Sequence, residues 1–344
     1  MKFYKKHKDL TVLLLVTAGI LLVAHTIRTV FRHQRLSIPE PVAVYIPSGS
    51  NFDQLCDTLR AHQCLADEHV FRSVAKVRGL DQHVKAGRYV LEPRMTLMHL
   101  VRKLYSGNQD PLSVTINRHR TNEQLCAFLG KKLEFSPDSL SLLLHDPEVC
   151  QSYGCTPQTI ISIFIQNTYE IYWTTTPRQL LDRMAKESDH FWTAVRTAQC
   201  HELHLSPQEV ITLASIVEEE TNQNDEKAQI ASVYLNRLRK GMLLQADPTV
   251  KYATGDFSLR RILGIHLKTD SPYNTYLYKG LPPGPICNPS VASIDAVLEN
   301  LNTNYLYFCA KEDFSGHHNF AATISEHMAN ARRFHQVLNQ RGIK

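Results

Sequence analysis

The chain has 344 residues, of which 43% are hydrophobic and 21% are charged, a balance that fits a globular protein with two or three domains. Its formal net charge of +5 resides in the first 35 residues, which hold seven Lys or Arg and one Asp, so the rest of the chain is close to neutral. A nucleic-acid-binding protein needs a basic patch in its folded part, and we therefore exclude nucleic acid as a partner.

Between two basic flanks lies an uncharged segment at 10–27, LTVLLLVTAGILLVAHTI. A membrane-spanning helix needs about 20 mostly apolar residues and at least about 17, so the sequence predicts a transmembrane anchor over 10–28. A cleaved signal peptide is the alternative, but the sequence that follows, HTIRTVFRHQR, has no small-residue A-x-A cleavage site.

The orientation of this anchor follows from the lengths on either side of it. The nine leading residues are too few to form a domain, and no second apolar span follows. We therefore predict a single-pass protein with residues 1–9 in the cytoplasm and everything after about residue 35 outside it. The positive-inside rule adds little, because both flanks are basic.

Eight cysteines, an even number, permit disulfides in an oxidising compartment. The close pairs Cys56/Cys64 and Cys150/Cys155 are the first candidates, and buried free thiols are the alternative. The sequence has no C-x-x-C motif, which argues against a zinc ribbon or a redox motif.

The first folded region, 40–109, reads as a small α/β module in the order β-α-α-β-α. Its strands are AVYI and GRYVLE, and its helices are NFDQLCDTLRAH, EHVFRSVAKVRG and TLMHLVRKLYSG, the last ended by Gly107. An intermediate region, 110–205, begins with the strand LSVTINR and the helix TNEQLCAFLGKK, which Thr121 caps, and continues as mostly helical sequence. The aromatic-rich insert QNTYEIYWTTTP interrupts it and is too polar for a simple core strand.

The third region, 206–344, opens with the helix SPQEVITLASIVEEETN. Ser206 is its N-cap, Pro207 takes the first helical position, and Glu209 completes a capping box. A second helix, NDEKAQIASVYLNRLRKG, has an apolar stripe that includes Tyr234 and ends at Gly241. Polar and aromatic loops follow, namely LLQADPTVKYATG, SPYNTYLYKGLPPGPI and SGHHNF.

Three consecutive glutamates end the first of these helices. Residues three and four apart share a helix face, so Glu220 continues the apolar stripe of Ile216 and Val217, whereas Glu218 falls on a mixed face and Glu219 on a polar one. Burial raises the pKa of a carboxyl, and a carboxyl with a raised pKa suits a general acid. The alternative is that the helix ends after Val217 and that all three glutamates are solvated.

Several stretches carry a resemblance to a known family: LASIVEEET, ASVYLNRLRKGMLLQADPTVKYATG, SPYNTYLYKGLPPGPICNPS and YLYFCA…GHHNF……H. With KAGRYVLEPRMTL, they resemble the YceG-like endolytic murein transglycosylases (MltG type), and the resemblance covers nearly the whole chain. It implies an α+β protein with a single N-terminal transmembrane helix, a LysM-like α/β module at 40–109, and a mixed α/β catalytic domain at 206–344.

The resemblance also implies an activity. Members of this family are bacterial inner-membrane enzymes that cut nascent peptidoglycan strands internally, between N-acetylmuramic acid and N-acetylglucosamine. They use neither water nor a cofactor and leave a 1,6-anhydro-muramyl end. The family's catalytic glutamate directly precedes the threonine of its E-x-E-T motif, which here makes it Glu220, before Thr221. Peptidoglycan strands, the plasma membrane and peptidoglycan synthases are the implied partners.

Two other hypotheses about the site stay open. An ordinary glycosidase needs two carboxylates, and Asp247 is the best second carboxylate for a muramidase-type hydrolase. An Asp before Pro in a loop is equally suited to a structural role. The second hypothesis is a catalytically silent scaffold that binds peptidoglycan. The intact E-x-E-T, Q-A-D-P-T and Y-N-T-Y segments argue against it.

Sugar sites use aromatic faces and amide or hydroxyl groups, which these loops supply at positions that match the family pattern. The predicted substrate-binding residues are Glu218, Gln245, Asp247, Thr249, Tyr252, Tyr273, Asn274, Thr275, Tyr276 and His318. The alternative for some of the tyrosines is a place in the core. No metal site is predicted, because HELH at 201–204 lacks the HExxH spacing and no ligand run accompanies His317, His318 and His327.

Two positions depart from the family pattern. The family often has proline where Gln166 stands and glycine where Ser290 stands. Gln166 is expected to relax its loop, and Ser290 matters only if its position requires a positive φ. Neither departure touches Glu220.

Overall fold

The computed structural model describes residues 16–21, 34–259 and 261–341. Most of the predicted anchor, 10–28, and all of the predicted cytoplasmic segment, 1–9, lie outside the described residues; within the anchor, residues 16–21 are helical and exposed. None of the helices in the described part of the chain has the length and apolar character that a bilayer crossing needs.

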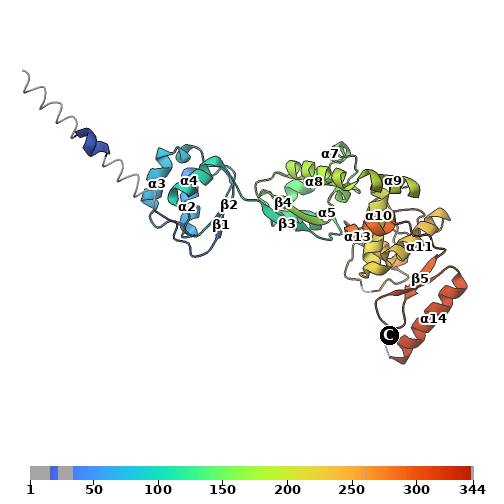
Figure 1. Ribbon diagram of the computed structural model, residues 1–344. Helices are drawn as coiled ribbons and strands as arrows, with labels where there is room; N and C mark the ends of the chain where they lie inside the picture. Colours follow the sequence, from blue (N-terminus) through green and yellow to red (C-terminus); the bar gives the residue numbers. More distant parts are fainter. Residues whose placement is uncertain (1–15, 22–33, 260, 342–344) are drawn as a thin grey trace, which may run out of the picture. The chain divides into compact units, whose positions relative to one another are not determined.

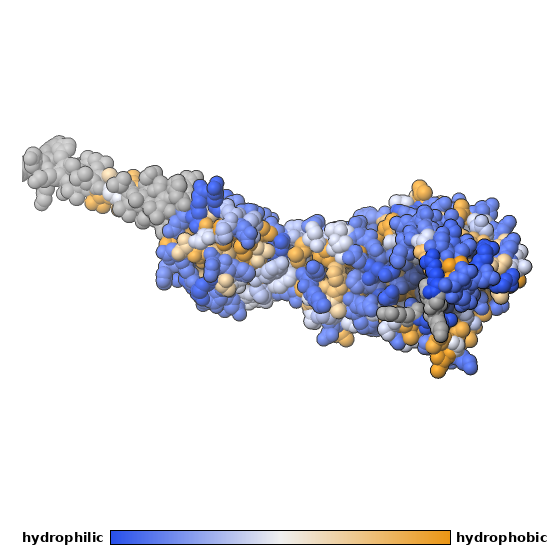
Figure 2. Space-filling view, turned by 90° about the horizontal axis from the view of Figure 1, so that it is seen from below, coloured by the Kyte–Doolittle hydropathy of each residue, from blue (hydrophilic) through white to orange (hydrophobic). Residues whose placement is uncertain are grey.

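The chain forms two compact units, which are described separately (Figure 1). Of the described residues, the first, here the N-terminal unit, comprises those up to 113 and 170–175, and the second, here the C-terminal unit, comprises 114–169 and those from 176 onward. On the face drawn in Figure 2, hydrophilic residues predominate and hydrophobic residues form only small patches.

The N-terminal unit has the element order that the sequence predicts. Its elements are β1 (Val42–Ile46), α2 (Phe52–Ala61), α3 (Glu68–Val77), the 3-10 turn η1 (Leu80–Gln82), β2 (Gly87–Leu91) and α4 (Leu97–Ser106). Strands β1 and β2 pair antiparallel, with Val42 opposite Leu91. Alternate residues of β2 are buried, as a strand with one face on the core requires. Gly107 ends α4 in the left-handed conformation, as predicted.

An ion-pair cluster joins α2 and α3 on the surface of this unit. Glu68 accepts from Arg60 Nε and from Arg72 Nε, each at 2.8 Å, and Arg72 also pairs with Asp53 at 2.7 Å. The hydrogen bonds from Arg60 and Arg72 lower the pKa of Glu68 to about 2, against a smaller opposing effect of burial. The cluster therefore keeps this carboxyl ionised at every physiological pH.

The C-terminal unit is mostly helical. Its helices are α5 (Asn122–Gly130), α6 (Pro137–His145), α7 (Pro147–Ser152), α8 (Pro177–Phe191), α9 (Ala194–Leu203), α10 (Pro207–Glu220), α11 (Lys227–Arg239), α12 (Asp247–Thr254), α13 (Val291–Leu298) and α14 (Ile324–Gln340), with short 3-10 turns η2 (Ile160–Ile163), η3 (Asn224–Glu226) and η4 (His266–Lys268). Strand β3 (Leu112–Ile116), at the boundary between the units, pairs with β4 (Asn167–Ile171), and β5 (Tyr307–Ala310) pairs with β6 (His318–Ala321).

Helix α10 lies at the centre of this unit. It contacts α9, α11, α12 and α13, and every residue from Val210 to Val217 is buried. The predicted capping box is present, since the Ser206 hydroxyl accepts from the Glu209 backbone and the Glu209 carboxylate accepts from the Ser206 backbone. The helix continues to Glu220, so the alternative that it ends after Val217 is wrong.

Two segments that the sequence left without regular structure are ordered elements. Residues 247–254, predicted as loop, form α12, which Pro248 favours in its first turn and left-handed Gly255 ends. The polar insert at 166–177 contains β4, whose inner face buries Tyr169 and Ile171 while the alternate residues stay exposed. A half-buried strand needs only every second residue to be apolar, and that explains the polar composition.

The cysteines are free thiols. All eight are unbonded and seven are buried, so the structure has neither candidate disulfide, Cys56/Cys64 or Cys150/Cys155. Burial raises the pKa of the Cys56 and Cys64 thiols to about 11, which keeps them protonated and unreactive.

Candidate active site

The last residue of α10, Glu220, lines a cavity of about 320 Å³ in the C-terminal unit. Helix α11 supplies Tyr234, whose hydroxyl donates to Glu220 Oε1 at 2.5 Å. The loop before α12, the loop after η4, strand β5 and helix α14 complete the wall. The lining residues are Glu220, Tyr234, Arg237, Leu244, Gln245, Asp247, Tyr276, Phe308 and His327.

The environment of Glu220 favours its neutral form. Burial raises its pKa to about 7, and the charges of Asp247 and Glu219 act in the same direction, while the Tyr234 hydrogen bond and the charge of Lys251 oppose them. No ion pair to Glu220 is formed by the described residues. A carboxyl with this pKa is available both as acid and as base near neutral pH.

A second carboxylate, Asp247, stands on the same cavity. It is the first residue of α12 and accepts a hydrogen bond at 2.6 Å from the hydroxyl of Tyr276. Burial and this bond raise the pKa of the Tyr276 phenol above its ordinary value, so the hydroxyl stays protonated. Of the predicted substrate-binding residues, Gln245, Asp247 and Tyr276 therefore share the cavity with Glu220.

Arg237 supports the loop that carries Gln245. Its buried guanidinium donates to the carbonyls of Leu306 at 2.7 Å and Leu244 at 2.9 Å, and to Gln245 Oε1 at 3.3 Å. Gln245 itself has a φ of +52°, in the left-handed region that a residue with a side chain rarely adopts. Such backbone strain persists only where surrounding contacts impose it and is concentrated at functional sites.

Three predicted substrate-binding residues lie in the interior and support the cavity wall. Thr249 and Thr275 are buried and bond to each other through their hydroxyls at 2.8 Å, and Thr275 Oγ1 also accepts from the backbone of Ala246. Asn274 is buried and donates to the carbonyls of Leu267 and Thr269. These side chains are satisfied within the protein, and none of them lines the cavity.

Tyr252 and Tyr273 form a ring pair with centroids 4.6 Å apart. Both are half-buried and pack against the core around α10, while Phe257 meets Tyr252 edge-on at 6.2 Å. Their place matches the core alternative for these two tyrosines, although each keeps part of its surface exposed.

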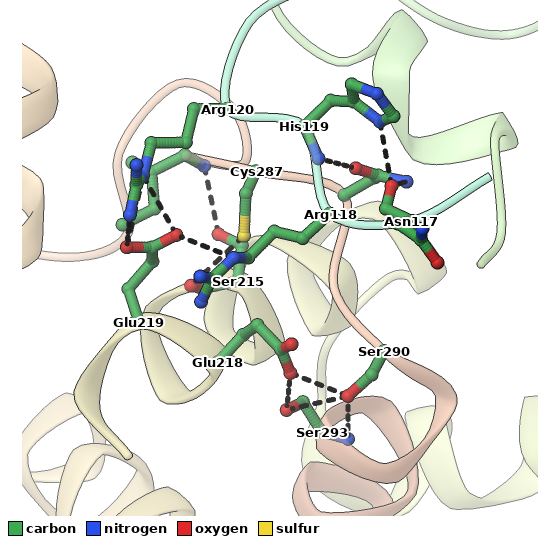
Figure 3. A network of polar contacts seen from close by, with 12 residues as sticks. Asn117, Arg118, His119, Arg120, Ser215, Glu218, Glu219, Cys287, Ser290 and Ser293 are labelled. Atoms are coloured by element: carbon green, nitrogen blue, oxygen red, sulfur yellow. Dashed lines mark hydrogen bonds and ion pairs between the residues drawn. The ribbon is translucent and has the colours of Figure 1, made fainter. Parts of the chain in front are cut away.

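Glu218 points into a polar network outside the cavity lining (Figure 3). It accepts from the hydroxyls of Ser290 at 2.6 Å and Ser293 at 2.5 Å, and from Lys227 Nζ at 3.0 Å. Burial alone would raise the pKa of Glu218, but these three donors lower it below its ordinary value. Ser290 has a φ of −66° and caps α13, so this position does not require the glycine that the family often has there.

His318 is hydrogen-bonded to the loop that follows α10. The Thr221 hydroxyl donates to Glu226 Oε1 at 2.6 Å, and Glu226 also accepts from the backbone of His318 and contacts its Nδ1, each at 2.9 Å. His318 is thus a support for the segment that follows Glu220, outside the cavity lining. His327 lines the cavity instead, with its Nδ1 lacking a hydrogen-bond partner among the described residues.

Five of the lining residues are not among the site residues that the sequence predicts: Tyr234, Arg237, Leu244, Phe308 and His327. Tyr234 was assigned to an apolar stripe, which is correct for its ring, and only the fold reveals that its hydroxyl reaches Glu220. In the described parts of the chain, no three His, Cys, Asp or Glu side chains converge as metal ligands would.

Comparison with known proteins places the chain in a family. A model of the YceG-like family matches residues 44–333, which include most of the N-terminal unit and every residue that lines the cavity. The chain belongs to the YceG-like family.

YceG-like relatives of this chain include proteins named endolytic murein transglycosylase. The chain is 31% identical to an "Endolytic murein transglycosylase" of Bacillus subtilis (strain 168), over 83% of this chain and 82% of that protein. It is 27% identical to a protein of the same name from Streptococcus pneumoniae, where the match spans 78% of this chain but only 54% of the longer relative. A crystal structure of a YceG-like protein from Listeria monocytogenes has 29% identity and a TM-score of 0.53, covering 84% of this chain and 99% of that one.

Proposed function

We propose that this YceG-like protein is an endolytic murein transglycosylase, a lyase that cuts the glycan strands of peptidoglycan between N-acetylmuramic acid and N-acetylglucosamine. The names of the B. subtilis and S. pneumoniae relatives support the substrate and the reaction class. The observation that carries the mechanism is a glutamate with a pKa of about 7 that lines a cavity and accepts a hydrogen bond from a phenol.

In the proposed reaction, Glu220 acts twice. Its protonated carboxyl donates to the glycosidic oxygen as the bond from that oxygen to C1 of muramic acid breaks, and an oxocarbenium-like state develops at C1. The carboxylate then accepts the proton of the 6-hydroxyl of the same sugar, whose oxygen closes on C1. The product is a 1,6-anhydro ring, and the glutamate ends in the protonated form with which it began.

Tyr234 and Asp247 have supporting roles in this proposal. The Tyr234 hydroxyl stabilises the carboxylate of Glu220 between its two proton transfers. Asp247 shares the cavity and raises the pKa of Glu220 by its charge. If water attacked C1 instead, Asp247 would be the base that activates it, as in an inverting glycosidase, and the product would be a reducing end.

We also propose the cellular setting. The uncharged segment at 10–27 supports an anchor in the bacterial inner membrane, with the two folded units outside the cytoplasm. There the N-terminal unit would act as a LysM-like module on the glycan strand, and peptidoglycan synthases would be neighbours. The sequence supports the anchor, and the family resemblance supports the LysM-like module and the neighbouring synthases.

The test is mass spectrometry of peptidoglycan strands after incubation with the purified full chain. Wild-type protein is expected to create ends one water lighter than reducing muramic acid, and Glu220→Gln is expected to create them about 10³-fold more slowly. Glu202→Gln, an exposed glutamate of α9, serves as the matched control and should keep full activity. Reducing ends would replace the lyase proposal with a hydrolase that uses Asp247, and strand binding without any new ends would favour a scaffold.

A further inference from the structure

Three carboxylates crowd the C-terminus of α10, and each has a different partner. The C-terminal end of a helix carries partial negative charge, and the last turn of α10 contains no basic residue that would offset it. Glu218 pairs with Lys227 at 3.0 Å and Glu219 with Arg120 at 2.8 Å, whereas Glu220 is bonded to the neutral Tyr234. Glu218 and Glu219 thus each have a cationic partner from another segment of the chain, whereas Glu220 has none among the described residues.

Glu219 has the stronger of these two arrangements. Arg120 Nε reaches both of its carboxylate oxygens, at 3.1 and 3.2 Å, and a terminal nitrogen reaches Oε2 at 2.8 Å. Arg118 approaches Oε1 at 3.5 Å from the same loop. The Glu219 side chain is only 11% exposed, so this is a forked and largely desolvated pair, the kind that fixes geometry as well as charge.

The loop that carries both arginines, residues 117–120, is itself held rigidly. The buried side chain of Asn288 accepts from the backbone of His119 at 2.6 Å and donates to the carbonyls of Asn117 and Phe164, each at 3.1 Å. The backbone of Asn288 donates to the His119 carbonyl at 3.0 Å. Figure 3 shows the two arginines of this loop turned toward Glu219.

We propose that Glu219 is a positioning residue, through which Arg118 and Arg120 hold the last turn of α10 so that the carboxyl of Glu220 stays in the cavity beside Tyr234. This inference rests on the proposed role of Glu220 but goes beyond it, because neither arginine touches the cavity. The loop between β3 and α5 thereby fixes the position of the last turn of α10, although the two arginines of this loop do not line the cavity.

The same pair limits the electrostatic effect of Glu219 on its neighbour. The charge of Glu219 raises the pKa of Glu220, and two guanidinium groups on the Glu219 carboxylate weaken that effect. The other groups that act on Glu220 are known from the structure: Asp247 and Lys251 through their charges, and Tyr234 through its hydrogen bond; Arg237, Tyr276 and His327 also line the cavity. Changes at Arg120 and Glu219 therefore should shift the titration of Glu220 in opposite directions.

The experiment measures the titration of Glu220 in the full chain in two ways. Difference infrared spectroscopy follows its carboxyl band without substrate, assigned by its loss in Glu220→Gln. The pH dependence of kcat/KM for strand cleavage follows the same group, whose protonated form is the active one. Arg120→Gln should move the midpoint and the basic limb up, and Glu219→Gln should move both down, each by about half a pH unit.

Two further variants separate charge and geometry from plain structure. Arg120→Lys keeps the charge and loses the fork, so the midpoint should stay near that of wild type while kcat falls severalfold. Arg196→Gln is the matched control, since Arg196 also forms a forked pair, with Asp295, and stacks on a phenylalanine, but away from α10's last turn. It should leave both midpoint and kcat unchanged.

The possible outcomes are distinct. Opposite shifts for Arg120→Gln and Glu219→Gln, a lower kcat for Arg120→Lys and no change for Arg196→Gln would support the proposal, and a wild-type kcat for Arg120→Lys would overturn it. Unshifted midpoints, or shifts in the same direction accompanied only by a lower Tm, would overturn it. If wild-type protein formed no anhydro ends, the proposed function would fail, but the infrared midpoints would still decide the inference about Glu219.

Discussion

Two glutamates in this chain have pKa values displaced in opposite directions. Glu68, on the surface of the N-terminal unit, is bonded to two arginines and has a pKa of about 2. Glu220, in the cavity of the C-terminal unit, is bonded to a phenol and has a pKa of about 7. Because the residue type is the same, the partner and the degree of desolvation decide the pKa of the carboxyl and therefore its chemistry.

The largest expected difference between the two is in activity. Glu220→Gln removes the proton donor and should lower strand cleavage by about 10³-fold, because general acid catalysis contributes roughly 10²–10⁴-fold. Glu68→Gln, made in parallel, should change the rate less than about twofold. The pKa of Glu68 is about 2, so this carboxylate holds no proton to donate near neutral pH. Initial rates of anhydro-end formation give both values; a loss of activity confined to Glu68→Gln would contradict the assignment.

The second expected difference is in how stability depends on pH. The folded-state pKa of Glu220 lies above its ordinary value, so the folded state holds the extra proton and wild type loses stability as pH rises from about 4.5 through 7. Glu220→Gln avoids that loss and should be the more stable protein at pH 8, by about 3 kcal/mol, with no advantage at pH 4. Thermal unfolding of both proteins at the two pH values measures the effect.

Glu68 should behave in the opposite way. Its folded-state pKa is lowered, so its contribution is present above about pH 4.5 and is lost as pH falls through 2. Glu68→Gln should therefore be less stable than wild type at pH 7, by at most about 1 kcal/mol because the pair is partly exposed. An equal pH dependence for the Glu68 and Glu220 variants would remove the basis of the comparison.

The arginine partners extend the contrast to a smaller scale. Arg120→Gln leaves Glu219 largely buried without its main cation and should cost about 2 kcal/mol. Arg72→Gln leaves Glu68 with Arg60 and with access to solvent, so its cost should stay near or below about 1 kcal/mol. Urea unfolding of the two variants at pH 7 compares them directly, and a larger cost for Arg72→Gln would mean that burial does not set the order.

Tyr234→Phe tests the hydrogen bond that Glu220 accepts. The hydroxyl stabilises the ionised form of Glu220, and its loss should raise the pKa of that carboxyl by about 0.7 pH unit, the equivalent of about 1 kcal/mol for one hydrogen bond. The basic limb of the kcat/KM profile should move upward by that amount. Tyr252→Phe, in the ring pair outside the cavity, is the control and should leave the limb in place.

Local sequence patterns predicted the elements that depend on local interactions. The strands and helices of the N-terminal unit, the capping box of α10 and the continuation of that helix to Glu220 all follow from periodicity and cap residues. Helix α12 was missed because its N-cap, Ala246, has no side-chain group that could signal a helix start.

Long-range partners limited what could be predicted for the site. The arginine that pairs with Glu219 lies 99 positions earlier in the chain, so the helix face alone assigned Glu219 to solvent. Thr249, Asn274 and Thr275 have the hydrogen-bonding groups of a sugar site, but composition does not distinguish a group that faces substrate from one that faces the protein. Glu218 was expected among the substrate-binding residues for the same reason, and the structure gives it three internal donors.

Asn288 has a consequence for how the protein is made. Its amide joins residues that are 169 positions away in the chain, at His119, and 124 positions away, at Phe164. Contacts of such high sequence separation form late and slowly in folding. The loop that pairs with Glu219 can therefore reach its final place only after residue 288 has been synthesised, and a nascent chain that has made α10 but not yet this asparagine lacks the contacts that fix Arg118 and Arg120.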